Sequence, residues 1–141
     1  MAYAELFCQS NFSFLQGASS PEELVQQAAA LGYAALALTD ECSVAGIVRA
    51  YRQIREQQLP LKLIVGSYFQ LDNLRLLLLC PNRLAYAELC RIITNSRRRA
   101  SKGQYQLDSW DLLSVRHCLA LWLPQGDAAS DQQWGPWLAK Q

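Results

Sequence analysis

Two adjacent carboxylates, Asp40 and Glu41, directly follow an apolar run that ends at Thr39. Chemistry in parallel α/β folds is concentrated at the carboxyl ends of strands, and carboxylates there can bind a divalent metal or act as a general base. Asp40 could instead cap the loop that leads into the next helix, with Glu41 solvated. We favour this structural alternative, because no histidine or third carboxylate has an evident place beside the pair.

A basic cluster forms the second candidate site and consists of Arg97, Arg98, Arg99 and Lys102. Such a cluster could contact a phosphate backbone or a protein partner. Alternatively, cations at the end of a helix complement its dipole, with ~0.3–1 kcal/mol for each charge. Only Tyr105 is an aromatic neighbour in sequence, so base stacking is not indicated. The two interpretations remain close, with a slight preference for the structural one.

The single histidine, His117, could in principle form a nucleophilic dyad with Cys8. A functional nucleophile also needs an orienting group and an oxyanion site, and neither is readable in the sequence. We therefore favour a solitary histidine at the start of a buried strand. The chain has 5 cysteines and no CxxC pair. This predicts a reduced, cytoplasmic protein whose thiols pack as small hydrophobes.

The composition restricts the class of protein to which these residues belong. The chain has 141 residues, of which 51% are hydrophobic and 18% charged, with a net charge of +1. Disorder needs low hydrophobicity and high net charge, so it is excluded. A near-zero net charge gives no overall nucleic-acid signature. No signal peptide is visible at the start, and no apolar run approaches the ~18 residues of a membrane span.

Alternating strands and helices must position the candidate residues. The hydrophobic pattern predicts strands over residues 2–8, 34–39, 61–65 and 118–123, and either a hairpin or two successive strands over 68–71 and 74–80. Helices are predicted over 20–31, 44–57 and 82–93, with a helical turn from Asp108. We expect the first strand to be buried on both faces and Gly66 to end the third. Trp134 and Trp137 lie in a terminal stretch that has no clear partner. The order predicts an α/β fold with mostly parallel strands.

Four segments of the chain, residues 3–25, 31–46, 63–69 and 89–103, carry a family resemblance. They include Asn11-Phe-Ser-Phe-Leu-Gln-Gly-Ala-Ser-Ser-Pro-Glu-Glu and Leu38-Thr-Asp-Glu. They resemble the amino-terminal PHP (polymerase and histidinol phosphatase) domain of C-family DNA polymerases, above all that of the error-prone branch. The resemblance covers nearly the whole chain and weakens after about Trp122. It implies a partial or distorted β/α barrel of the PHP type with flanking helices.

Active members of the resembled family bind a cluster of divalent metals through histidines and acids at strand ends. At five of the corresponding positions this sequence lacks the histidine or glutamate that the family has there. The residues present are Phe7, Gln9, Ser20, Glu41 and Tyr68. Only Asp40 keeps the family's ligand type. A multinuclear site needs nitrogen and oxygen ligands from several strands. The resemblance therefore implies a non-catalytic module without cofactor, in which Asp40 and Glu41 are the residual metal candidates.

The resemblance also sets expectations for the surroundings of the chain. We expect one PHP-like domain over residues 1–141, forming the N-terminal fragment of a longer polymerase that uses Mg²⁺. Its partners would be the rest of that chain, DNA through the parent enzyme and other damage-tolerance proteins. An open sheet edge could allow self-association. Two alternatives stay open: a residual metal-dependent phosphoesterase using Asp40 and Glu41, and a stand-alone DNA- or protein-binding module using the basic cluster.

Overall fold

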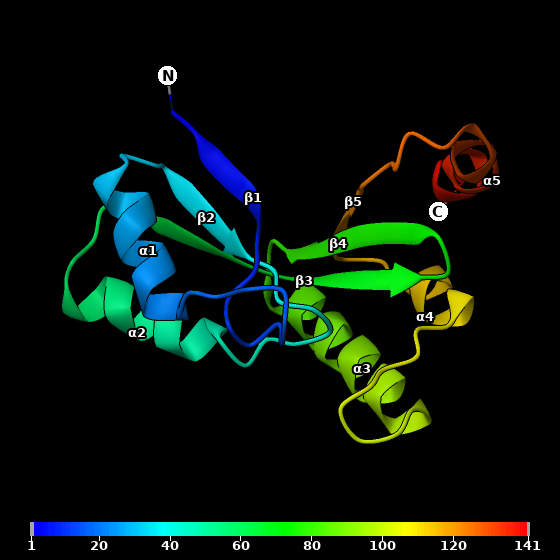
Figure 1. Ribbon diagram of the computed structural model, residues 1–141, viewed down its shortest axis with the longest axis horizontal. Coiled ribbons are helices and arrows are strands. Elements are labelled where there is room, and N and C mark those ends of the chain that lie inside the picture. The colour runs from blue at the N-terminus through cyan, green and yellow to red at the C-terminus, as the bar shows by residue number, and fades with distance from the viewer. Residues whose placement is uncertain (1, 141) are drawn as a thin grey trace.

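The order of the strands in the sheet follows their order in the chain. The computed structural model describes residues 2–140 and forms one five-stranded sheet. Its strands are β1 (Ala4–Cys8), β2 (Ala35–Leu38), β3 (Lys62–Leu71), β4 (Leu74–Cys80) and β5 (Leu119–Trp122). β1, β2 and β3 are parallel, whereas β4 runs antiparallel to β3 and β5 antiparallel to β4. The sheet curls into an open half-barrel (Figure 1), so the predicted partial α/β barrel with flanking helices is confirmed, with a mixed sheet.

Two helices connect the parallel strands and cover the same side of them (Figure 1). α1 (Pro21–Ala30) begins as predicted, with Ser20 and Glu23 forming a capping box. Gly32 follows it at φ +74°, a conformation that suits glycine. α2 (Ile47–Glu56) leads from β2 to β3. Their apolar residues pack on β2 in one cluster, which includes Val25, Ala28, Leu36, Leu38, Ala50 and Leu61.

The second half of the sheet packs on α3 (Arg83–Arg99), which Asn82 caps as predicted. Its core contains Phe69, Leu74, Leu76, Leu78, Leu89 and Ile92. α3 continues six residues beyond the predicted end at Ile93, so that Arg97, Arg98 and Arg99 form its last turn. α4 (Ser109–Leu113) begins at the predicted cap, Asp108. Of the two alternatives for residues 68–80, the structure has the hairpin, formed by β3 and β4 with Asp72 at φ +51° in its turn.

Three local expectations were wrong, each for a physical reason. β1 is an edge strand rather than a buried one, and Phe7 is 42% exposed. Gly66 does not end a strand, because β3 runs through it. Residues 128–138 form a helix, α5 (Ala128–Leu138), in which Trp134 is buried and donates from Nε1 to Asn73 Oδ1 at 2.6 Å. An indole with a hydrogen-bond partner can be buried without penalty.

Gly66 is required for close packing between strands. A Cβ atom at this position would lie 2.6 Å from Leu79 Cδ2 and 2.9 Å from the Leu78 carbonyl oxygen. Such distances force the backbone of β4 or the side chain of Leu79 to move. The glycine is thus a packing residue inside a continuous strand.

None of the helices within residues 2–140 has the length and the apolar composition that crossing a membrane would require.

We expect Gly66→Ala to lower the free energy of unfolding by about 1–3 kcal/mol, because it overpacks the β3–β4 contact. Urea denaturation followed by circular dichroism measures this difference. Gly135→Ala is the control, since its Cβ would meet Trp122 at an ordinary 3.6 Å. It should leave stability unchanged or raise it by up to about 1 kcal/mol, as alanine favours a helix. Equal effects of the two substitutions would contradict the packing role of Gly66.

Candidate functional site

Asp40 lies just beyond the carboxyl end of β2 and is only 2% exposed. Its carboxylate accepts three hydrogen bonds from the loop after β1. The Ser10 amide donates to Oδ1 at 2.7 Å and the Ser10 hydroxyl to Oδ2 at 2.8 Å. The Ser13 hydroxyl donates to Oδ1 at 2.7 Å. Both oxygens therefore have donors from within the protein, which is the condition under which a buried carboxylate is tolerated.

Further hydroxyl groups extend this network across the ends of three strands. Thr39 Oγ1 donates to the Cys8 carbonyl and accepts from the Cys8 amide, both at 3.1 Å. Ser67 Oγ donates to the Asp40 carbonyl at 2.7 Å and accepts from the Ser43 amide at 3.1 Å. These bonds join β1 to β2 and β2 to β3 at their carboxyl ends. Asp40 is therefore part of the packing of this end of the sheet, which confirms its placement at a strand end.

Glu41 is half-buried and contacts the segment that follows α3. Tyr105 donates its hydroxyl to Glu41 Oε1 at 2.7 Å and accepts from the Gln70 amide at 3.0 Å. Burial, followed by the bond to the Glu41 carboxylate, raises the pKa of Tyr105 far above its ordinary value. The phenol therefore stays protonated and keeps donating. The expected solvated Glu41 is instead a hydrogen-bonded group.

A cavity of about 550 Å³ opens beside Glu41. It is lined by Phe7, Gln9, Gln16, Glu41, Tyr68, Gln70, Arg75, Leu123 and Pro124. The fold thus brings together four positions at which the family resemblance expects metal ligands: Phe7, Gln9, Glu41 and Tyr68. The rings of Phe7 and Tyr68 stack at 5.5 Å between centroids. Burial raises the pKa of Tyr68, so this phenol is a poor source of an anionic ligand.

The side chains around this cavity do not fit the metal cluster that the fold family implies. Both Asp40 oxygens already accept hydrogen bonds from serines, and a Cβ at Gly46 would lie 3.1 Å from Oδ2. Within residues 2–140, no group of three or more His, Cys, Asp or Glu side chains is placed to hold a metal ion. Ser20, the remaining position, caps α1. An amide and two aromatic rings offer neither the charge nor the imidazole nitrogens that such ions require.

The Cys8–His117 pair does not form a dyad. The His117 amide donates to Glu88 Oε2 at 2.9 Å, and no hydrogen bond joins its ring to Cys8 within residues 2–140. His117 is exposed and lies two residues before β5, an edge strand, so the expected position at the start of a buried strand was wrong. Burial raises the pKa of the Cys8 thiol to about 11. A nucleophilic thiol requires the opposite shift.

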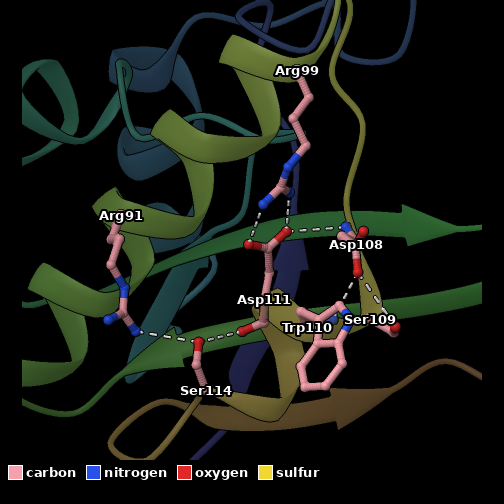
Figure 2. Close-up of polar contacts among 7 residues, drawn as sticks. All are labelled: Arg91, Arg99, Asp108, Ser109, Trp110, Asp111 and Ser114. Atoms are coloured by element: carbon pink, nitrogen blue, oxygen red, sulfur yellow. Dashed lines mark hydrogen bonds and ion pairs between the residues drawn. The ribbon is translucent and has the colours of Figure 1, made fainter.

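The basic cluster divides into two groups of side chains. Arg97 donates to the carbonyl oxygens of Cys42 at 3.1 Å and Glu41 at 3.3 Å, and lies over the Tyr105 ring. Arg99 forms a two-pronged ion pair with Asp111, which is 6% exposed (Figure 2). Arg98 and Lys102 are exposed and make no side-chain hydrogen bond or ion pair within residues 2–140. Nucleic-acid or partner contact by the cluster stays a prediction, and these two cations are the accessible ones.

Sequence reasoning missed the serines and Tyr105 as members of the site. A usable signal was present for Ser10 and Ser13, because both follow β1 at the sheet end where Asp40 lies. Tyr105 is 64 residues from Glu41 in sequence. No local pattern connects two such distant positions.

We expect Asp40→Ala to destabilise the fold by about 2–4 kcal/mol, because buried donors of Ser10 and Ser13 lose their acceptor. Asp40→Asn keeps the size and one acceptor oxygen and should cost less. Urea denaturation in the presence of a chelator measures both. If Asp40 were instead a metal ligand whose charge is uncompensated without the metal, removing that charge would raise the stability of the metal-free protein. That result would contradict the structural role.

Arg99→Ala should lower the urea midpoint, because it leaves the buried Asp111 carboxylate with one cation fewer. Arg98→Ala is the matched control on the same helical turn and should leave the midpoint unchanged. A DNA-binding assay on the two variants then separates function from folding. Weaker binding by Arg98→Ala at unchanged stability would support the predicted phosphate contact, whereas unchanged binding would remove it.

Comparisons with known proteins concern the family and the fold of the chain. The profile of the PHP domain family matches residues 5–125. An error-prone DNA polymerase of Vibrio vulnificus (strain YJ016) is 64% identical over 99% of this chain, which spans 14% of that relative's length. The error-prone DNA polymerase of Aromatoleum aromaticum is 55% identical over 92% of the chain, which spans 12% of it.

A solved structure from Bifidobacterium adolescentis, named as a metal-dependent phosphoesterase, superposes with a TM-score of 0.51 at 24% identity. The match covers 70% of this chain and 35% of that one, and it concerns the fold alone. The family match begins at the second residue of β1, continues through β5 and includes every residue that lines the cavity beside Glu41. The chain therefore belongs to the PHP domain family.

Proposed function

We propose that this chain is the N-terminal PHP module of an error-prone DNA polymerase, and that the module itself is non-catalytic and has a structural and interaction role. The single observation that carries the proposal is the state of Asp40. Its carboxylate is buried and accepts hydrogen bonds from Ser10 and Ser13, so it links the loop after β1 to the end of β2. This is a position at which the resemblance to the PHP family predicts a metal ligand.

The interaction role rests on exposed apolar side chains. The loop after β1 presents Phe14 and Leu15, which are 84% and 88% exposed. Leu15 holds a φ of +63°, an unfavourable conformation for leucine that the surrounding loop must maintain. Trp110 on α4 and Leu119 on the edge strand β5 are also exposed. The adjacent pair Phe14 and Leu15 is the part of this set that suits a contact with a neighbour, because exposed apolar residues mark interaction sites when they are contiguous. The neighbour we propose is the rest of a polymerase chain, and in its absence two copies could associate through the open edges of β1 and β5.

The wider function would be that of the parent enzyme. Error-prone DNA polymerases related to this chain are about seven times its length, since it spans 14% of one of them. We propose that the parent carries out DNA-directed DNA synthesis in damage tolerance and repair, in the cytoplasm, with Mg²⁺ held by acidic residues outside this chain. DNA and other damage-tolerance proteins would be reached through the parent.

The proposal is tested by incubating the purified chain with Mn²⁺ or Zn²⁺ and a chromogenic phosphoester. We expect no metal-dependent turnover and no saturable metal binding by calorimetry. A variant with restored ligands, Phe7→His, Gln9→His, Glu41→His and Tyr68→Glu, is the positive control, because all four positions line one cavity. It should bind Zn²⁺ measurably if circular dichroism shows that it is folded.

Metal-dependent turnover by the unmodified chain would contradict the non-catalytic role and favour the residual phosphoesterase. Loss of that turnover in Glu41→Gln, which keeps an acceptor for Tyr105, would assign it to this cavity. The variant also distinguishes loss of a ligand from loss of the fold, because its urea midpoint should match that of the unmodified chain.

A further inference from the structure

Two of the five cysteines lie directly opposite one another across neighbouring strands. Cys80 is the last residue of β4, and Cys118 immediately precedes β5. The antiparallel register pairs Leu79 with Leu119, so the next opposed pair is Cys80 with Cys118. Both side chains pack against the core between the sheet and α3, so they point to the same face.

The hydrogen-bond pattern of the ladder brings this pair close together. The Leu123 amide donates to the Arg75 carbonyl at 2.9 Å, which makes 75 and 123 a hydrogen-bonded pair. Bonded and non-bonded pairs alternate in antiparallel strands, so Cys80 and Cys118 form a non-bonded pair. Consistent with this, the Cys118 amide donates to Glu88 Oε2 at 3.2 Å instead of to β4. Non-bonded pairs have Cα atoms about 4.5 Å apart, which lies within the range of disulfides.

The two thiols are chemically different, although they are neighbours in the ladder. The Cys118 sulfur lies 3.2 Å from the Ala85 carbonyl oxygen, an acceptor that favours its protonated form. The interaction with the neighbouring thiol lowers the pKa of Cys80 and raises that of Cys118. The nearby Glu88 carboxylate opposes ionisation of both. Burial raises the pKa of Cys8 and of Cys42 to about 11, so Cys80 is more readily ionised than either of them.

Neither Cys80 nor Cys118 is fully buried. Cys118 also lines an apolar cavity of about 360 Å³ between β5 and the two helices α4 and α5.

We propose that Cys80 and Cys118 are a modification site that forms a reversible intramolecular disulfide, with a low-molecular-weight disulfide such as oxidised glutathione as the oxidant. The Cys80 thiolate attacks one sulfur of oxidised glutathione, which forms a mixed disulfide and releases one glutathione thiolate. Cys118 loses its proton to solvent and attacks the Cys80 sulfur, which releases the second glutathione. The dithiol is oxidised by two electrons and the glutathione disulfide is reduced to two thiols.

The bond would fasten the edge strand β5 to β4 and close the segment of α3 and α4 into a loop. β5 is paired on one side only and carries exposed apolar residues, so it is the strand with the least support on that side of the sheet. A covalent link here raises the resistance of the fold to unfolding, chiefly by restricting the unfolded chain. The oxidised chain should therefore have a higher urea midpoint than the reduced chain, and dithiothreitol should reverse the shift.

The test treats the folded chain with oxidised glutathione and measures its intact mass. The expected product has lost two hydrogen atoms, and non-reducing peptide mapping joins the peptides of Cys80 and Cys118. Cys118→Ser should instead accumulate one glutathionyl group on Cys80, because the resolving thiol is missing. Cys80→Ser should react several-fold more slowly. Cys90→Ser, which removes a partly buried thiol of α3, is the control and should form the link as the unmodified chain does.

A second measurement does not depend on variants. Dibromobimane becomes fluorescent when it bridges two close thiols, and on the unmodified chain it should join the same two peptides. Linkage of any other cysteine pair, or separate glutathionyl adducts on both Cys80 and Cys118, would overturn the proposal. The proposal would also fail if oxidised glutathione left the mass of the reduced chain unchanged, although an alkylating reagent still modified both thiols in the folded chain.

Discussion

The arrangement of the strand ends depends on the buried carboxylate of Asp40. A carboxylate removed from water costs several kcal/mol unless cations or hydrogen-bond donors replace its hydration. Here the donors are one amide and two hydroxyls, all from the loop after β1. That requirement fixes where the loop must run. A Cβ at Gly17 would lie 2.1 Å from the Ser10 carbonyl oxygen, so the return of the loop depends on a residue without a side chain.

The same constraint bears on the side chains that line the neighbouring cavity. Because donors of Ser10 and Ser13 replace the hydration of the Asp40 carboxylate, a bound cation is not needed to hold this group in the interior. Three of the other positions at which the family resemblance expects ligands carry uncharged side chains. They hold Gln9 and the stacked rings of Phe7 and Tyr68. Glu41, the other carboxylate, is held by Tyr105, while Arg97 donates to the carbonyl of Glu41 itself. Arg97 thereby connects the last turn of α3 to the strand ends. Its guanidinium group makes its hydrogen bonds inside the molecule.

Local signals in the sequence predicted the elements well where one residue type has one role. Ser20 with Glu23 marks the start of α1, and the uninterrupted apolar run of β2 marks a central parallel strand. The errors arose where a pattern has two physical causes. The apolar β1 suggested burial on both faces, but edge strands can also be apolar where the sheet meets a further neighbour. Gly66 suggested a break, but close approach of β4 needs the same residue. Trp134 found its partner in Asn73, 61 residues away, and sequence alone contains no trace of that pairing.

The site was harder to predict than the fold, because its chemistry lies in hydrogen-bond partners rather than in residue types. An aspartate at position 40 could serve either as a metal ligand or as the acceptor of a serine network. Only the positions of Ser10 and Ser13 distinguish the two. A metal site leaves a carboxylate oxygen open toward the other ligands. In this chain both oxygens face serine donors, and Oδ2 also lies close to Gly46. The serine donors use three of the roughly four lone-pair positions of this carboxylate, two on Oδ1 and one on Oδ2. A cation bound at Asp40 would have to share Oδ2 with the Ser10 hydroxyl or displace a serine donor. The network therefore competes with metal for the same lone pairs, and it is intramolecular and always present. Asp40 therefore has a role in the fold that does not depend on the residues at the other expected ligand positions.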